Sequence, residues 1–264
     1  MQASVIISYY KNLTQLQVLL SALNAQTALG SFEVMISEDD DSPSTNAFIQ
    51  KLKPGLRFPV SHIQQPDEGF RKCKALNSSI KLAASDLLIF LDGDCIPHKK
   101  LVAQYLKAQA PGAVLYGRRV MLSKSLSSLI LKTGNTRLLH LINLLIYGCR
   151  RIEDGIFFPV PRFFLKKSDG FLLGCNMAIN KKELLAINGF DEDYNFPGGG
   201  EDSDIEWRLK KLPAVYFKTM RFRALVYHIF HPIRFSAEQE EKNNAFMLEK
   251  IKLGNYYCKN GLQK

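Results

Sequence analysis

The chain has 264 residues, of which 46% are hydrophobic and 23% are charged. This composition supplies the apolar material for a large core and excludes a disordered chain, and average glycine (17) and proline (11) usage excludes collagen-like and low-complexity sequences. The net charge of +10 is uneven, because residues 99–168 hold thirteen Lys or Arg against two acids, Glu153 and Asp154. This segment therefore carries +11 and the rest of the chain −1, which favours a phosphate-rich partner such as nucleic acid or an anionic membrane surface.

Cysteine usage and the N-terminus both indicate a reducing environment. The five cysteines are odd in number, and no two have CxxC spacing, so we expect neither a disulfide framework nor a cysteine zinc site. They are Cys73, Cys95, Cys149, Cys175 and Cys258. Residues 1–7 lack the basic start and apolar run of a secretory signal. We therefore expect a cytoplasmic protein, and the basic segment adds a peripheral position on the inner face of the membrane.

The first hundred residues alternate short apolar runs with helical patterns. We predict strands at residues 4–9, 32–37, 56–63 and 87–91 and helices at 13–23, 43–52 and 70–84. This alternation predicts an α/β fold with a parallel sheet and helices on both faces. Residues 8–12, after the first strand, contain no glycine, which argues against a dinucleotide fingerprint or a P-loop.

The later part of the chain is less regular. Residues 126–147 are rich in Leu and Ile, but polar residues interrupt them, so they cannot cross a bilayer as an apolar segment of ~20 residues. They form either a basic helix on a membrane surface or a helix packed on the core. Prolines indicate a loop at residues 157–164. The remaining predictions are helices at 99–110, 181–186, 202–211 and 237–252, strands at 113–116, 171–179, 215–217 and 225–227, and a turn at 198–200.

Two carboxylates, Asp92 and Asp94, follow the apolar strand at 87–91. Residues i and i+2 of an extended chain point the same way, so these side chains can converge, and Gly93 leaves room for a ligand. They lie at the edge where open α/β sheets bind ligands. The pair suits Mg²⁺ or Mn²⁺ with positions left for phosphate oxygens, and an acidic turn without a metal is the alternative.

A second acidic group follows three glycines, and two histidines follow a late strand. Glu201 and Asp202 begin a helix after residues 198–200, where an ordinary helix start needs no glycine run. His228 and His231 come at the end of an apolar strand, where imidazole could complete a carboxylate metal site or be structural.

Two further charged segments fit a nucleotide. Glu38 and Asp39 follow the second strand and could accept hydrogen bonds from a nucleobase imide or ribose, or could cap the next helix. The helix at 70–84 begins with Arg71, Lys72 and Lys74, although a helix N-terminus favours anions. A bound diphosphate would resolve this conflict.

In this order, these residues resemble the family 2 glycosyltransferases of the GT-A fold. The resemblance lies in residues 8–10, 38–42, 69–77 and 90–94, and residues 174–178, 188–192 and 199–202 resemble a galactosyltransferase-type C-terminal module. It implies a Rossmann-like, mixed and mostly parallel sheet flanked by helices. It also implies one continuous domain, with a nucleotide-sugar-binding half at 1–110, a basic leucine- and aromatic-rich insertion at 111–169, and an acceptor-binding and catalytic half at 170–264.

The resemblance also implies roles for individual residues. Asp39, with Glu38 as the alternative, would contact the uracil of a UDP-sugar. The rest of the donor site would comprise Ser8, Tyr10, Arg71, Lys74, Asn77, Asp92 and Gly93. Asp94 would be the main ligand of Mn²⁺ or Mg²⁺, with Asp92 and with His228 or His231. Asp202 would be the general base and Glu201 would position the acceptor.

The implied reaction is an inverting, metal-dependent transfer of a sugar from a UDP-sugar to a hydroxyl of a saccharide or lipid-linked saccharide. We expect it in the synthesis of cell-surface polysaccharide or lipopolysaccharide, at an anionic membrane surface and without nucleic acid. Two positions depart from the family pattern. Glu38 stands where Asp is common, and residues 196–197 (Phe-Pro) replace a Trp.

Three alternatives belong to other classes. In a haloacid dehalogenase-type phosphatase the DxD would lie on the first strand and continue to Thr or Val, but Cys95 follows here. A nucleotidyltransferase would carry a glycine-rich N-terminal loop. A basic membrane- or nucleic-acid-binding module on a transferase-like sheet would not need the separated carboxylates Asp94 and Asp202, and the sequence contains no nucleic-acid-binding motif that we recognise.

Overall fold

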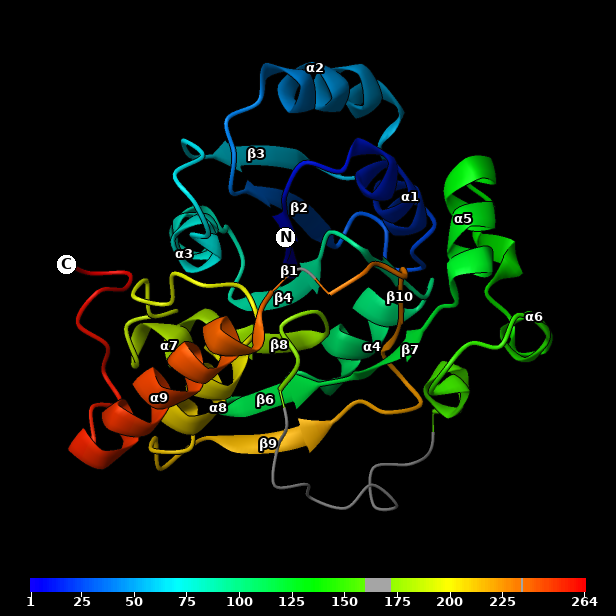
Figure 1. Ribbon diagram of the computed structural model, residues 1–264. Coiled ribbons are helices and arrows are strands. Elements are labelled where there is room, and N and C mark those ends of the chain that lie inside the picture. Colours follow the sequence, from blue (N-terminus) through cyan, green and yellow to red (C-terminus); the bar gives the residue numbers. More distant parts are fainter. Residues whose placement is uncertain (160–171, 234) are drawn as a thin grey trace.

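The computed structural model describes residues 1–159, 172–233 and 235–264, and in this part of the chain the main sheet has seven strands (Figure 1). Their order is β3 (Val60–Gln64), β2 (Phe32–Glu38), β1 (Ala3–Tyr9), β4 (Leu87–Asp92), β8 (Met177–Asn180), β6 (Ala113–Tyr116) and β9 (Tyr216–Thr219). Only β8 runs antiparallel to its neighbours, β4 and β6. The prediction of a mixed, mostly parallel α/β sheet is therefore confirmed.

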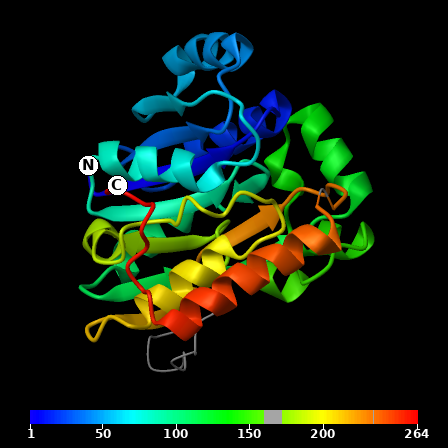
Figure 2. The ribbon, with the colours of Figure 1, turned by 60° about the vertical axis from the view of Figure 1, so that its left-hand side comes forward.

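Helices cover both faces of this sheet because its inner strands are apolar on both sides. Val5 and Ile7 of β1 pack in one buried cluster with α1 (Leu13–Asn24), α2 (Pro43–Leu52) and α4 (Leu101–Ala108). Ile6 packs in the opposite cluster with α3 (Lys72–Leu82), α7 (Lys181–Leu185) and α8 (Glu201–Leu209). Figure 2 shows α9 (Ala237–Leu253) running along the outside of α8.

A second, three-stranded sheet lies beside the first. Its order is β5 (Cys95–Pro97), β10 (Leu225–His228) and β7 (Arg118–Met121). It packs against α1, α5 (Lys124–Thr133) and α6 (Leu141–Ile146). The leucine-rich stretch 126–147 thus forms two helices, because the chain takes a left-handed turn at Gly134. Three 3₁₀ turns complete the described elements: η1 (Lys53–Gly55), η2 (Thr136–Leu138) and η3 (Ile152–Gly155).

Asn176 links the two sheets through its side chain, which is fully buried. Its Nδ2 donates to the carbonyls of Arg118 at 2.7 Å and Ala224 at 2.9 Å. Its Oδ1 accepts from the hydroxyl of Tyr105 at 2.6 Å. Gly117 makes room for it, since a Cβ at 117 would lie 2.0 Å from Nδ2. The turn before β8 is therefore fixed to both sheets.

Some sequence predictions differ from this fold in extent. The strand predicted at 56–63 begins at Val60, after η1, and the one predicted at 171–179 is β8, which begins at Met177. Residue 171, and residues 160–164 of the predicted loop, lie outside the described residues. The division at 110 and 169 stays a prediction. No helix in the described parts of the chain is both long and apolar enough to span a bilayer.

Candidate active site

The site is built where β4 ends beside β1. Asp92, the last residue of β4, pairs in register with Ser8. The chain then turns at Gly93, whose N–H donates to the Ser8 carbonyl at 2.7 Å. A Cβ at 93 would lie 3.1 Å from that carbonyl oxygen, so the close approach to β1 favours glycine. Asp94 consequently leaves the sheet directly beside the end of β1.

Asp94 lies beside two histidines from β10 and the loop after it. Asp94 Oδ2 is 3.4 Å from His228 Nε2 and 3.1 Å from His231 Nε2. One ligand atom from each of the three residues lies within 4.8 Å of the others. The Ile229 N–H donates to the Asp94 carbonyl at 2.9 Å, which ties the two segments together. The structure thus brings both histidines to the carboxylate, where the sequence left open which of the two would be a ligand.

The surroundings of these side chains favour the forms that bind a divalent cation. His231 Nδ1 lies 2.8 Å from the Pro232 carbonyl, which can only accept, so Nε2 is the nitrogen that can lose its proton and bind a metal. Burial lowers the pKa of His228, and Arg119 and His231 lower it further, although Asp94 raises it. Burial alone would raise the pKa of Asp94, but the hydrogen bond of His231 and the charges of both imidazoles lower it to about 2. An ionised carboxylate and neutral imidazoles are the forms that bind metals.

Lys72, on the first turn of α3, joins the two carboxylate groups predicted from the sequence. Its Nζ lies 3.0 Å from Asp92 Oδ1 and 3.1 Å from Glu201 Oε1 on α8. Burial would lower the pKa of Lys72, but these two carboxylates raise it well above its usual value. The three residues line a small pocket together with Ser8 and Gly174. From the sequence, Lys72 is predicted only as part of a basic helix start, because its partner Glu201 lies 129 positions away.

Asp202 follows Glu201 on α8 and is held by two backbone N–H groups. Its Oδ2 accepts from Gly174 at 3.2 Å and its Oδ1 from Ser203 at 2.8 Å. Gly174 lies near this edge of the sheet because β8 is antiparallel to β4, so the residues before β8 lie where β4 ends. Burial and the charge of Glu201 raise the pKa of Asp202 to about 6, although Lys72 and the two N–H groups lower it. A carboxylate with this pKa suits general-base chemistry near neutral pH.

Glu38, at the end of β2, is completely buried. Its Oε1 accepts from the Thr45 hydroxyl at 2.6 Å, and its Oε2 lies 2.6 Å from His62 Nε2. The carboxylate thus joins α2 to β3, and its exposed fraction is 0%.

Asp39 is the next residue and connects this turn to the start of α3. Its Oδ1 accepts from Gln65 Nε2 at 2.6 Å, and its Oδ2 accepts from the Arg71 N–H at 2.7 Å. Each oxygen therefore keeps the capacity for one more hydrogen bond. The Arg71 guanidinium turns to the Glu68 carboxylate, 2.5 Å away, and to the Pro66 carbonyl.

Two other predicted donor-site residues, Tyr10 and Lys74, are partly or largely exposed. Tyr10 is 48% exposed, and its hydroxyl donates to Asp67 at 3.3 Å. Lys11 forms an ion pair with the same carboxylate. Lys74 is half-buried on α3.

Asn77, also predicted for the donor site, is buried and bonded to another loop. Its Nδ2 donates to the Phe190 carbonyl at 2.8 Å and to Glu192 Oε1 at 3.0 Å, and its Oδ1 accepts from the Phe190 N–H at 2.9 Å. The structure therefore gives this side chain a role in holding the 188–192 loop against α3.

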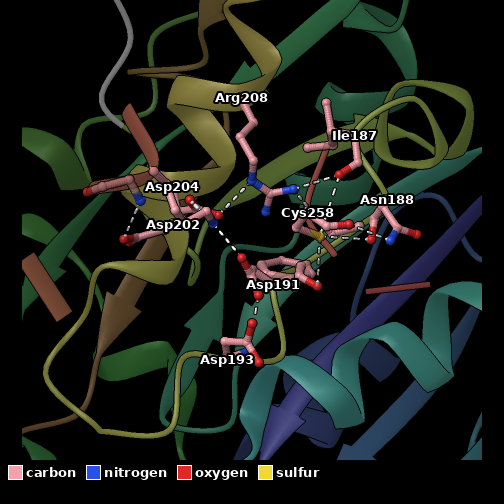
Figure 3. Close-up of polar contacts among 12 residues, drawn as sticks. Ile187, Asn188, Asp191, Asp193, Asp202, Asp204, Arg208 and Cys258 are labelled. Carbon is pink, nitrogen blue, oxygen red and sulfur yellow. Dashed lines mark hydrogen bonds and ion pairs between the residues drawn. The ribbon is translucent and has the colours of Figure 1, made fainter. Parts of the chain in front are cut away.

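Buried charges fix α8 to the segments around it, and Figure 3 shows Asp191, Asp204 and Arg208 of this group. Asp204 lies 2.6 Å from Arg208 Nε and 2.5 Å from Lys250 Nζ on α9. Lys250 also lies 2.5 Å from Asp191 Oδ2, and Arg208 donates to the Ile187 carbonyl at 2.8 Å. These buried ion pairs therefore hold α8 in place, including its first turn with Glu201 and Asp202.

Two family models match this chain. The model of glycosyl transferase family 2 matches residues 4–182, and a model described as the N-terminal domain of galactosyltransferase matches residues 162–232. The chain is 23% identical to chondroitin synthase of Escherichia coli over 85% of its own length and 34% of that protein. It is 27% identical to validoxylamine A glucosyltransferase of Streptomyces hygroscopicus subsp. jinggangensis over 78% of its own length and 50% of that protein. It therefore spans between a third and a half of these relatives.

Solved structures share the fold. The mannosyltransferase PcManGT from Pyrobaculum calidifontis, in complex with GDP-Man and Mn²⁺, superposes with a TM-score of 0.65 and 12% identity, over 96% of this chain and 64% of that one. GalNAc-T7 with UDP, GalNAc and Mn²⁺ also gives a TM-score of 0.65, with 15% identity over 94% of this chain and 48% of that one. With its match over more than half of its residues, the chain belongs to glycosyl transferase family 2.

Proposed function

We propose that this protein transfers a sugar from a UDP-sugar to a hydroxyl of a saccharide acceptor, with inversion and with a divalent cation. The observation that carries the proposal is the Lys72 bridge between Asp92 and Glu201. It brings the carboxylate predicted for the donor and the carboxylate predicted for the acceptor into one pocket. In this proposal the nucleotide diphosphate binds on the Asp92 side of Lys72, and the acceptor alcohol binds on the Glu201 side.

The donor side is the edge formed by β1, β2 and β4. The free hydrogen-bonding capacity of the Asp39 oxygens suits the imide N–H of uracil, and Asp92 suits ribose hydroxyls. GalNAc-T7, with UDP and Mn²⁺, supports this choice of base, whereas PcManGT is complexed with GDP-Man. We therefore take UDP as the first donor to test and GDP as its competitor.

Asp94, His228 and His231 would hold the cation. Imidazole ligands favour Mn²⁺ over Mg²⁺, which prefers an all-oxygen shell. When bound, the ion would act as a Lewis acid for the negative charge of the departing diphosphate. Both fold relatives described above are complexed with Mn²⁺, which supports this assignment.

Asp202 takes the proton of the acceptor hydroxyl in this proposal. Its two N–H bonds aim the carboxylate, and its pKa of about 6 leaves it ionised at neutral pH while still basic enough to accept a proton. Glu201, held by Lys72, would orient the acceptor. A single displacement, with one base to take the acceptor proton, inverts the configuration at the anomeric carbon of the sugar. The likeness to chondroitin synthase supports a saccharide acceptor of the kind used in cell-surface polysaccharide or lipopolysaccharide synthesis.

A binding screen tests the donor and the metal together. UDP, GDP, CMP and their sugars are added with and without Mn²⁺, and thermal unfolding is followed, because a ligand at about 100 times its Kd adds ~2.7 kcal/mol of stability. We expect Mn²⁺-dependent stabilisation by UDP. Asp94→Asn should abolish the Mn²⁺ dependence, whereas Asp86→Asn, an exposed control, should keep it. Mn²⁺-dependent UDP binding that survives in Asp94→Asn would exclude this metal site.

A further inference from the structure

Helix α6 presents its apolar residues to solvent. Leu141, Ile142, Leu145 and Ile146 are 40%, 64%, 60% and 73% exposed, while Leu144 is completely buried. These four residues, the α6 aliphatic face, lie on one side of the helix, because positions i, i+1, i+4 and i+5 cover an arc of about 140°. A surface helix normally turns such a face to the core. This one packs through Leu144 alone and leaves the rest uncovered.

The chain around the α6 aliphatic face is mainly positive. Residues 99–152 contain ten Lys or Arg and no Asp or Glu, and the two acids that follow in η3, Glu153 and Asp154, pair with Arg221. Arg137 lies four residues before the helix, and Arg150 and Arg151 lie four and five residues after it, all exposed. Within the described residues, none of these three arginines forms an ion pair with a carboxylate. An apolar face with unpaired cations beside it matches an anionic lipid surface in both polarity and charge.

We propose that the α6 aliphatic face inserts into the headgroup region of an anionic bilayer, with Arg137, Arg150 and Arg151 on lipid phosphates. Size favours a bilayer over a protein partner. A helix of six residues is about 9 Å long, which is too short to supply the ~800 Å² that each partner buries in a stable protein complex. Insertion into lipid sets no such minimum, since its free energy grows with each buried side chain.

The surface is connected to the metal end of the site. The buried Ser127 hydroxyl of α5 accepts from the Phe230 N–H at 2.9 Å, and the Leu122 N–H, just before α5, donates to the His228 carbonyl at 3.0 Å. Figure 1 shows α5 and α6 together at one edge of the molecule, away from α7, α8 and α9. Docking through α6 would therefore hold the histidine loop near the lipid surface. Delivery of a lipid-linked acceptor there rests on the proposed function, whereas the docking itself does not.

Vesicle sedimentation without substrates tests the docking. The full chain is mixed with phosphatidylcholine vesicles, with or without phosphatidylglycerol, at low and high salt. We expect binding to the anionic vesicles that falls at high salt. Ile142→Ser with Ile146→Ser should weaken binding at least ~10-fold through lost apolar burial. Arg150→Gln with Arg151→Gln should weaken it by a similar factor.

A matched control comes from α9. Leu248→Ser with Leu253→Ser removes two aliphatic side chains that are 55% and 64% exposed, and should leave vesicle binding unchanged. Equal binding to neutral and anionic vesicles, or full binding by the isoleucine variant, would overturn the proposal. So would a dimer in sedimentation velocity that the isoleucine variant dissociates, because the face would then be a contact between copies. A soluble-acceptor transfer assay reports separately on the proposed function.

Discussion

Two aspartates in the site have pKa values moved in opposite directions by their surroundings. Asp94 faces two imidazoles, which lower its pKa to about 2, whereas burial and Glu201 raise the pKa of Asp202 to about 6. Two carboxylates whose pKa values differ in this way have different chemistry at neutral pH. The first stays ionised and suits a cation, and the second can take up and release a proton.

Asp202→Asn removes the base in the proposed reaction. We expect kcat to fall by at least ~100-fold, the lower range of general-base catalysis, while UDP affinity changes little. Folding raises the pKa of Asp202 from 3.8 to about 6, so the folded state loses stability as the pH rises through this range. The Asn variant, which does not ionise, should therefore be no less stable at neutral pH. Steady-state kinetics measure the change in kcat, and calorimetry with UDP measures the change in UDP affinity. Normal turnover by the Asn variant would remove Asp202 from the role.

Lys72→Met tests how the bridge sets the pH dependence. Lys72 lowers the pKa of Asp202, so its loss should raise that pKa above about 6. The activity of a base falls as pH drops through its pKa, so the acid limb of the kcat profile should move to higher pH. Lys81→Met, an exposed change on the same helix, should leave the limb in place. An unmoved limb in Lys72→Met would show that Lys72 does not act on the base.

At the level of elements, α9 holds the glycine turn that leads into α8. The buried Asn243 donates from Nδ2 to the carbonyls of Phe196 at 3.0 Å and Gly199 at 2.8 Å. Gly200 has φ of 106°, and a Cβ there would lie 3.0 Å from the Tyr194 ring. The turn therefore needs both glycine and the asparagine to place the first residues of α8.

Asn243→Ala should loosen this turn. We expect a higher KM for the acceptor and a lower kcat, with UDP binding kept, because this turn places Glu201 and Asp202, which act on the acceptor in the proposed function. The loss of two buried hydrogen bonds should also cost about 1–3 kcal/mol of stability. Asn244→Ala, the exposed neighbour, is the control for both readings. If UDP binding falls as much as acceptor use, the turn does not act on the acceptor side alone.

The elements that the sequence predicts well are those with a local signal. The helix at 43–52 has proline at its first position, and the strand at 113–116 is uniformly apolar, and both are found at those bounds. β5 and β7 carry no such signal. They have three and four residues, β7 begins with Arg118 and Arg119, and both exist because β10, far along the chain, pairs with them.

The candidate site shows the same limit. A motif such as Asp92-Gly93-Asp94 can be found from spacing on one strand. The ion pairs of Lys72, and the contact of Glu38 with His62, depend on which strands and helices become neighbours. The buried state of Asn77 likewise follows from the loop at Phe190. These roles depend on which distant segments pair with one another, and the local sequence pattern carries no information about that pairing.

At the scale of the whole molecule, a buried charge cluster attaches α9 to the rest. Lys250, on α9, contacts Asp191 and Asp204, and all three side chains are nearly or fully buried. Lys250→Met would leave two buried carboxylates without this partner, which typically costs about 3–5 kcal/mol. Urea unfolding should show that loss. Lys252→Met, a change at an exposed residue two positions farther along α9, should show almost none. Equal stabilities of the two variants would contradict this account.

Gly117 and Asn176 meet so closely that a side chain at 117 has no room. A Cβ there would also lie 2.8 Å from the Ala224 carbonyl oxygen, so a smaller residue at 176 would not make room for it, and that residue would give up the three bonds that join α4 and both sheets. Among descendants of this fold, glycine at 117 should therefore persist whatever residue stands at 176, and the loss of Asn176 should be selected against for its lost bonds.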